Sequence, residues 1–408
     1  MKLDVLGDDL PVRLRDGEKA PFVHLDYAAS APCVRAAADA VAEALPWYGS
    51  VHRGAGVRSS RSTLAYERAR QVVGDFVGAE AGDAVVFTRN TTDALNLLAR
   101  ALPAGTTTVL FDGEHHANLL PWPAPVRLPA PRDPDEAARA LDRALAAVDG
   151  PAVFAVTGAS NVTGEVWPVR RLADVAHARG ARVVVDAAQL APHRAVDMTA
   201  LGADYLAFSG HKLYAPFGAG VLVGRADWLD AAEPYLRGGG ASLAVGDGRG
   251  EVTWATGPAR HEAGTPNLVG AVALAAVCAA LMEADRDALH AHEQRLLARL
   301  RAGLAAAVPA AVPVSLFGDD HPRVGIVSVA LPGHDVGAVA ERLGTDHGIG
   351  VRAGQFCAHP LTRRLTGAAA GGECGTGPAA LLRISFGLGS TEQDIDRVVA
   401  ALAAETAS

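Results

Sequence analysis

The sequence contains few cysteines. There are four among 408 residues, namely Cys33, Cys278, Cys357 and Cys374. Their spacing matches neither a C-x-x-C redox motif nor the ligand pattern of a zinc site. We therefore expect free thiols, no metal site and a cytoplasmic location.

The chain also lacks a block of positive charge and a long apolar segment. Its formal net charge is −8, which argues against nucleic acid or an anionic membrane as the main partner. The opening stretch MKLDVLGDDLPVRLRDGEK has no apolar core of a secretory signal. The longest apolar stretch, residues 271–282, is too short and alanine-rich to span a bilayer. We expect no membrane segment.

The sequence does contain an alternation of apolar strands and amphipathic helices. Strand candidates lie at residues 84–88, 108–111, 152–157, 182–185, 205–208 and 220–223, with helical patterns at 93–101, 134–148 and 169–179. This alternation predicts an α/β fold with a mostly parallel sheet. Ligands of such sheets bind beyond the carboxyl ends of the strands.

The pattern changes near residue 264 and predicts a smaller α+β domain. Helices are expected at 271–284, 287–307 and 392–404, and strands at 325–329 and 381–386. The stretch AAAGGECGTG at 368–377 has the composition of a flexible loop. We divide the chain into an N-terminal segment (1–25) packing on the small domain, a large domain (26–265) and a small domain (266–408).

The stretch YLAFSGHKLY at 205–214 places Lys212 between two apolar strands. An ordinary surface turn would explain its serine, glycine and lysine. However, a lysine enclosed by apolar segments tends to lose its proton or to serve a chemical purpose.

Two further strand ends carry polar residues with more than one possible use. Thr91 and Thr92 could simply cap a helix, or they could help bind a phosphate at its N-terminus. Asp186 ends the strand RVVVD and could be a cap, a metal ligand or a carboxylate paired with a pyridinium nitrogen.

His115 and Asn161 also follow strand ends. The adjacent pair His115 and His116 suggests a metal, but consecutive side chains seldom share one ion. An imidazole stacked on an aromatic cofactor fits better. Asn161 could donate to a phenolate oxygen, although such residues are usually turn formers.

Taken together, these residues match the needs of pyridoxal 5′-phosphate (PLP). Lys212 could form an imine, Asp186 could bind the ring nitrogen, and Thr92, Ser209 and His211 could hold the phosphate. Neither a P-loop motif nor a Rossmann fingerprint is present where it would be expected.

The chain resembles the PLP-dependent class V aminotransferase-like enzymes of fold type I, and most closely the SUF-type (group II) cysteine desulfurases and selenocysteine lyases. The matching stretches include HLDYAASA (24–31), VHRG (51–54), NTTDALNL (90–97), EHHANLLPW (114–122), SNVTG (160–164), VDAAQ (185–189), SGHKLYAPFGAG (209–220), EAGTPN (262–267) and VRAGQFCAHP (351–360). They occur in the family's order over nearly the whole chain.

The resemblance implies roles for the cofactor-binding residues. Lys212 would carry the imine and Asp186 would pair with the pyridine nitrogen, while His115 would stack on the ring. Gln189 and Asn161 would contact the phenolic oxygen. The phosphate would be held by Thr91, Thr92, Ser209 and His211.

The resemblance also implies a homodimer with shared active sites, because Thr265 would reach the phosphate of the other subunit. Arg383 would bind the substrate carboxylate through a bidentate pair. Arg352 and His52 are the other expected substrate-binding residues.

Cys357 determines which reaction is expected. A free cysteine is usually a small buried apolar residue, but here Arg352 and His359 are neighbours that could favour a thiolate. In the resembling family this residue takes sulfur from L-cysteine as a persulfide, leaves L-alanine, and passes the sulfur to a thiol or an acceptor protein. The alternatives are a C–S lyase, an epimerase, an aminotransferase, or a sulfur-delivery protein that works only with a partner.

Three departures from the family's pattern lie near the expected substrate site. Phe356 stands where a histidine often precedes the cysteine, and GLGS at 387–390 replaces a common Tyr-Asn pair. RSSR at 58–61 replaces a less basic stretch. Cys374 could relay sulfur, although a lone loop cysteine is usually inactive. The first three departures lie around the expected substrate pocket and not around the cofactor, so they bear on the identity of the substrate and leave the expected cofactor unchanged.

Overall fold

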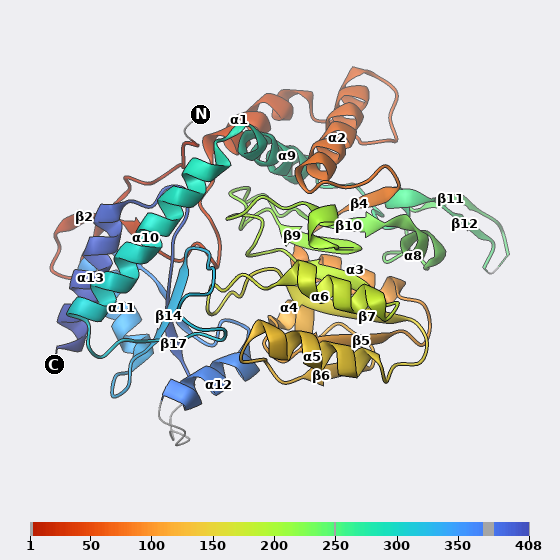
Figure 1. Cartoon of the computed structure of the whole chain (residues 1–408). Coiled ribbons are helices and arrows are strands. Elements are labelled where there is room, and N and C mark those ends of the chain that lie inside the picture. The colour runs from red at the N-terminus through yellow and green to blue at the C-terminus, as the bar shows by residue number, and fades with distance from the viewer. Residues whose placement is uncertain (1–2, 249, 370–378, 408) are drawn as a thin grey trace.

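The computed structural model of the protein describes residues 3–248, 250–369 and 379–407. Within these residues, the largest sheet has seven strands in the order β4-β10-β9-β8-β7-β5-β6. They are β4 (Asp83–Thr88), β10 (Gly220–Arg225), β9 (Tyr205–Ser209), β8 (Arg182–Asp186), β7 (Ala152–Thr157), β5 (Thr107–Phe111) and β6 (Pro125–Leu128). In this sheet β10 is antiparallel to both β4 and β9, and the other pairs are parallel. The predicted mostly parallel sheet is confirmed (Figure 1).

Helices cover both faces of this sheet, because its central strands are apolar on both sides. They are α3 (Thr91–Ala101), α4 (His116–Leu119), α5 (Pro134–Leu145), α6 (Val169–Ala178), α7 (Met198–Leu201) and α8 (Ala226–Ala231). Val109 and Val183 share one core with α5 and α6, whereas their neighbours Leu110 and Val184 share another with α3 and α4. Adjacent strand residues face opposite sides, and each such fully buried side chain contributes about 1.5–3 kcal/mol.

Three helices form a further layer beside β4. They are α1 (Arg35–Ala44), α2 (Val57–Phe76) and α9 (Leu268–Glu283), and α9 contacts both of the others. Helix α9 begins directly after Asn267, whose side chain caps it by accepting a hydrogen bond from the Gly270 N–H. The predicted division of the chain between residues 265 and 266 stays a prediction.

A second, smaller sheet has the order β13-β14-β17-β16 in the described part of the chain. Its strands are β13 (Val312–Pro313), β14 (Ile326–Ala330), β17 (Leu381–Ser385) and β16 (Arg352–Gly354), and the nearby helices are α10 (Arg286–Ala307), α11 (Val336–His347), α12 (His359–Ala369) and α13 (Glu392–Thr406). Leu300, Leu343 and Leu402 bring α10, α11 and α13 into one core with β14 and β17. The sheet carries Arg352 and Arg383 on neighbouring strands.

The N-terminal residues contact this second unit. Strand β3 (Val23–His24) pairs in parallel with β15 (Ile349–Gly350), and β1 (Pro11–Arg13) pairs with β2 (Lys19–Pro21). Val23 and Leu25 belong to the same core as Leu343. The next residue, Asp26, forms a bridge with Ser385, so the N-terminal segment leads directly to the carboxyl end of β17.

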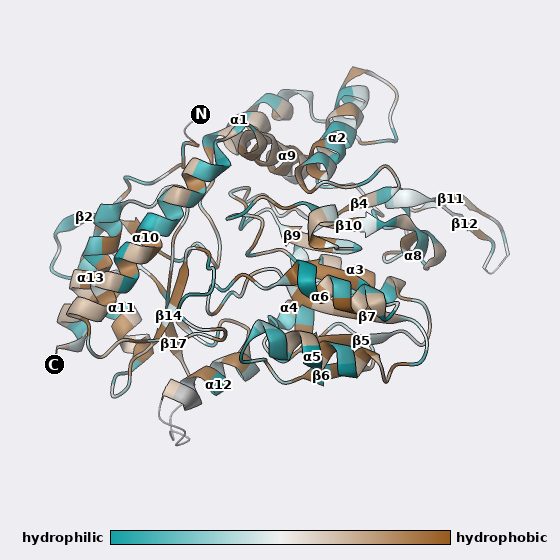
Figure 2. Cartoon of the chain, in the orientation of Figure 1, coloured by the Kyte–Doolittle hydropathy of each residue, from teal (hydrophilic) through white to brown (hydrophobic). Residues whose placement is uncertain are grey.

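The hydropathy of the elements matches their packing. In Figure 2, β14 and β17 are brown, whereas α5, α6 and α10 carry alternating teal and brown segments. No single helix within the described residues is long and apolar enough to cross a membrane; α9 and α10 meet that condition only as a pair, across a bend of 92°.

Candidate active site

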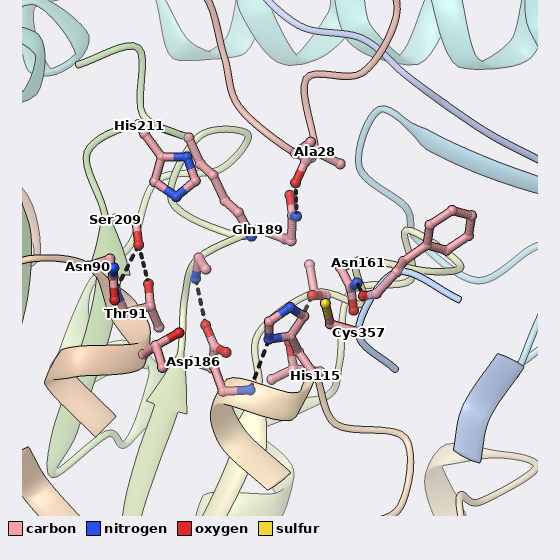
Figure 3. A pocket seen from close by; sticks show the side chains of 18 of the residues that line it. Ala28, Asn90, Thr91, His115, Asn161, Asp186, Gln189, Ser209, His211 and Cys357 are labelled. Atoms are coloured by element: carbon pink, nitrogen blue, oxygen red, sulfur yellow. Dashed lines mark hydrogen bonds between the residues drawn. The ribbon is translucent and has the colours of Figure 1, made fainter. Parts of the chain in front are cut away.

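A cavity of about 230 Å³ lies at the carboxyl ends of β7, β8 and β9. This is the edge where ligands of parallel sheets bind. On the side of the second sheet it is lined by residues of β16, of β17 and of the turn after β16, and Figure 3 shows Cys357 of that turn at the cavity. The predicted site residues on its wall are Thr91, Thr92, His115, Asn161, Asp186, Gln189, Ser209, His211, Lys212, Arg352, Cys357 and Arg383.

Lys212 lies in the turn between β9 and β10. The turn requires glycine at position 210, because a Cβ there would lie 2.9 Å from the Ala219 carbonyl oxygen. Burial lowers the pKa of Lys212 to about 8, with Arg383 and Arg352 acting in the same direction and Asp186 opposing them. Near neutral pH such a lysine holds a far larger share of free amine than an ordinary lysine does, which suits a nucleophile or a base.

Asp186 is the last residue of β8 and is buried beneath the cavity. Its Oδ1 accepts a hydrogen bond of 3.0 Å from the Ala188 N–H. Burial raises the pKa of Asp186, while the Ala188 N–H and the positive charge of Lys212 oppose that rise. A buried carboxylate at this position favours a cationic ligand group.

His115 caps the short helix α4, and its Nδ1 accepts a hydrogen bond of 3.0 Å from the Ala117 N–H. This contact places the ring proton on Nε2. Burial lowers the pKa of His115 to about 3, and the positive charges of Lys212 and other neighbours add to that effect. The ring is therefore neutral and able to stack on an aromatic ligand.

The N-terminus of α3 forms one end of the cavity. Asn90 caps this helix by accepting a hydrogen bond from the Asp93 N–H. The Ser209 Oγ accepts a hydrogen bond from the Thr91 N–H and lies 2.7 Å from the Thr91 Oγ1. Thr92 and His211 also line the cavity. Backbone N–H groups and hydroxyls at a helix N-terminus are suited to bind a phosphate.

The amide side chains of Gln189 and Asn161 connect separate segments of the wall. Gln189 Nε2 donates to the Ala28 carbonyl oxygen at 2.7 Å, and Asn161 Nδ2 donates to the Phe356 carbonyl oxygen at 2.7 Å. Each amide nitrogen has a second N–H that a ligand could use. Their predicted contact with a phenolic oxygen stays a prediction.

Arg383 is buried, with 2% of its surface exposed. Its Nη2 donates to Asp26 Oδ1 at 2.8 Å and its Nη1 donates to the Asn161 carbonyl oxygen at 3.0 Å. The buried Nε has no hydrogen-bond partner among the described residues. Arg352 lies 3.9 Å from the other Asp26 oxygen and also lines the cavity. An anionic ligand group would satisfy the remaining N–H groups of Arg383.

Cys357 has an exposed side chain at the cavity wall. Figure 3 shows its sulfur on the same side of the cavity as the His115 ring. The backbone of Cys357 is left-handed (φ 53°), and its carbonyl oxygen accepts a hydrogen bond of 2.7 Å from the His116 N–H. A non-glycine residue in this conformation costs free energy and occurs often at functional sites.

Two predicted site residues lie elsewhere within one chain. His52 lines a second cavity of about 300 Å³, and its Nε2 lies 2.9 Å from Glu67 Oε1. Thr265 is exposed between Gly264 and Pro266, which line that second cavity. Cys374 and most of the predicted loop at 368–377 lie outside the described residues.

Asp26, Asn90 and Glu114 also help to build the site, and the sequence analysis did not predict them. Asp26 follows an apolar strand in the stretch HLDYAASA, and Asn90 precedes Asp93 by three residues, which is the spacing of a helix cap. Glu114 is fully buried and accepts hydrogen bonds from the Thr157 N–H and Asn118 Nδ2. Strand-end and cap signals could have pointed to these positions, but their partners depend on the tertiary fold.

The arrangement fits a phosphorylated pyridine such as PLP. A buried carboxylate, a neutral imidazole, a lysine of lowered pKa and a helix N-terminus all border one cavity. Among the residues that the structure describes, no group of three histidine, cysteine or acidic side chains could hold a metal ion.

Comparison with known proteins shows the family to which the chain belongs. Residues 23–398 match the model of the aminotransferase class-V family. A cysteine desulfurase from Dickeya dadantii (strain 3937) is 36% identical over 417 residues, covering 98% of this chain and 96% of the relative. A cysteine desulfurase from Haloferax volcanii is 35% identical over 405 residues, covering 95% of this chain and 90% of the relative.

Two solved structures have the same fold. The apo structure of the cysteine desulfurase from Thermococcus onnurineus NA1 has a TM-score of 0.81 and 30% identity, and 94% of each chain is covered. The cysteine desulfurase CsdA from Escherichia coli, in its S-sulfonic acid form, has a TM-score of 0.79 and 30% identity, again with 94% of each chain covered. The predicted fold type I architecture is confirmed, and the chain belongs to the aminotransferase class-V family.

Proposed function

We propose that the protein is a PLP-dependent cysteine desulfurase that converts L-cysteine to L-alanine and transfers the sulfur to Cys357. The observation that carries this proposal is the exposed Cys357 thiol on the wall of the same cavity as Lys212 and Arg383. The nearly full-length relatives named cysteine desulfurases support the same activity.

The residues around the cavity provide a place for each part of PLP. Asp186 would pair with the ring nitrogen, His115 would lie on the ring, and Lys212 would form the covalent link. The helix start at Thr91 and Thr92, with Ser209 and His211, would hold the phosphate. When bound, PLP supplies an electron sink that makes the Cα–H and Cβ–S bonds of an attached amino acid labile.

Lys212 would carry the proton transfers. Its pKa of about 8 allows the amine to accept the Cα proton and to return a proton later in the cycle. Arg383 would bind the substrate carboxylate and Arg352 would add positive charge beside it. Together they would orient the substrate sulfur toward Cys357.

Cys357 would act as the nucleophile. Its thiolate forms an S–S bond with the substrate sulfur, while the Cβ–S bond of the substrate breaks and its electron pair is protonated at Cβ to give alanine. The persulfide on Cys357 is then reduced by a thiol, or its outer sulfur passes to an acceptor protein. Exposure of Cys357 provides the access that this last step needs.

A homodimer would explain the two site residues that lie outside the cavity. Thr265 and His52 lie at the second cavity, where a partner subunit could be received. Large apolar side chains are exposed on α2 and on the hairpin of β11 (Ser242–Val245) and β12 (Val252–Trp254), including Val57, Leu64, Leu243 and Val245. Exposed apolar groups of this kind are typical of subunit interfaces.

The direct test measures alanine and sulfide after the protein is incubated with L-cysteine and a reductant. The wild type should give equal amounts, and Cys357→Ala should lose at least about 100-fold of the rate while keeping the visible absorbance of bound PLP. Pyruvate with sulfide, or a rate independent of Cys357, would instead indicate a lyase of the same fold.

A further inference from the structure

Phe356 lies in the turn that carries Cys357 and contacts Arg383, the proposed receptor of the substrate carboxylate. It immediately precedes the thiol, lines the cavity, and has only 6% of its surface exposed. An aromatic side chain at this position cannot exchange protons, so its contribution must come from packing and from the face of its ring.

The ring lies against the guanidinium of Arg383. The distance from the Arg383 Cζ to the ring centroid is 4.7 Å, within the range of a cation–π contact. Asp26 and the Asn161 carbonyl oxygen each hold one nitrogen of the same guanidinium. With the ring beside it and two nitrogens engaged, the guanidinium of Arg383 is fixed, while its buried Nε lacks a partner among the described residues.

The backbone of Phe356 is held as firmly as its ring. Phe356 and Cys357 have left-handed backbones (φ 51° and 53°), which non-glycine residues adopt only when neighbouring contacts require it. Asn161 Nδ2 donates to the Phe356 carbonyl oxygen and the His116 N–H donates to that of Cys357. Moving the ring would therefore disturb both the guanidinium and the turn.

We propose that Phe356 is a positioning residue that fixes the Arg383 guanidinium for the carboxylate of an amino acid and ties it to the turn bearing Cys357. This inference rests on the proposed function, because Arg383 is there the carboxylate receptor. Phe356 would then set the preference for a carboxylate by acting through Arg383.

The test compares two amines, one with a carboxylate and one without it. The holoenzyme is titrated with L-alanine and with ethylamine, and the change in PLP absorbance gives a dissociation constant for each. The variants are Phe356→Ala, Phe356→Leu, which keeps much of the apolar volume, and Phe317→Ala. Phe317 packs on Trp167 and does not line the cavity, so it controls for the loss of a phenyl ring.

Phe356→Ala should weaken L-alanine binding about tenfold and ethylamine binding less than about twofold, with Phe356→Leu weakening L-alanine about threefold. Phe317→Ala should change neither constant. Equal weakening of both amines, or unchanged L-alanine binding in Phe356→Ala, would overturn the inference; if that variant does not fold, Phe356→Leu decides by the same ratio.

The amine titration and the assay with L-cysteine allow the two proposals to fail separately. A wild type that binds L-alanine but releases no alanine from L-cysteine would refute the proposed function, while the alanine-to-ethylamine ratio would still decide the role of Phe356. A wild type whose absorbance responds to neither amine would refute both.

Discussion

Several ionisable side chains around the cavity are buried, and burial destabilises their charged forms. Burial acts against the charged forms of Lys212, His115 and Asp186 alike. A pyridinium ring between Asp186 and Lys212 would stabilise the carboxylate and keep the lysine neutral. The pKa shifts of these residues therefore agree with a cationic ring as the natural ligand.

The lowered pKa of Lys212 predicts how cofactor attachment depends on pH. Because only the neutral amine attacks the aldehyde of PLP, the rate with cofactor-free protein should rise with pH and level off above about 8. Replacing Arg352 by Gln removes a positive charge that lowers this pKa, so the profile should move to higher pH. Stopped-flow absorbance measures both profiles. A wild-type rate still rising near pH 10, about where an ordinary lysine titrates, would contradict the prediction.

Among the helices and strands, long periodic segments were predictable and irregular ones were not. The sequence pattern located α3, α6, α10 and the central strands within a few residues of their observed bounds. Helix α2 was missed because Ser59 and Ser62 lie on its buried side, so its packing face is not uniformly apolar. Edge strand β6 was missed because much of its PVRL stretch is exposed.

In the candidate site, residues at the ends of regular elements were predictable, whereas contacts between distant segments were not. Lys212, Asp186 and Thr91 follow, end or begin regular elements, so their convergence at one sheet edge follows from the fold class. The pairing of Arg383 with Asp26 brings together residues far apart in the chain, and no local pattern indicates it. The contact of Phe356 with Arg383 likewise depends on the tertiary fold.

The cap of helix α3 predicts an effect on cofactor binding. Asn90→Ala removes the hydrogen bond to the Asp93 N–H and should cost about 1 kcal/mol of stability. Because this helix start borders the cavity, PLP retention should also weaken about three- to tenfold. Urea unfolding and equilibrium dialysis measure the two effects.

Asp133→Ala provides the control for Asn90→Ala. Asp133 caps α5 through the Glu136 N–H and does not line the cavity. Its replacement should cost similar stability without changing PLP retention. Equal loss of PLP in both variants would mean that the start of α3 has no special role in binding the phosphate.

In the molecule as a whole, the cavity combines parts of both sheets. Asp186 ends a strand of the large sheet and Lys212 follows another, whereas Arg383 lies in β17 of the second sheet and Cys357 follows β16 of that sheet. Substrate recognition and cofactor binding would therefore depend on how these two units pack. The exposed position of Thr265 adds the prediction of a third contribution, from a partner subunit.

A mixed dimer tests whether the partner contributes. Lys212→Ala and Thr265→Ala should each be impaired, but a heterodimer of the two contains one site with both native residues. Mixing and refolding them, or expressing them together, should restore up to about one quarter of the wild-type rate, since about half of the dimers are mixed and each has one intact site. Absence of any gain over the separate variants would contradict a shared site.

Whether Cys357 carries the sulfur is decided by the mass of its peptide after a single turnover with L-cysteine in the absence of reductant. We expect a gain of one sulfur atom on Cys357, removed by a thiol, together with one alanine released for each modified chain. Alanine formed without added sulfur on Cys357, or sulfur found on another cysteine of a Cys357→Ala variant with unchanged alanine release, would contradict the persulfide mechanism.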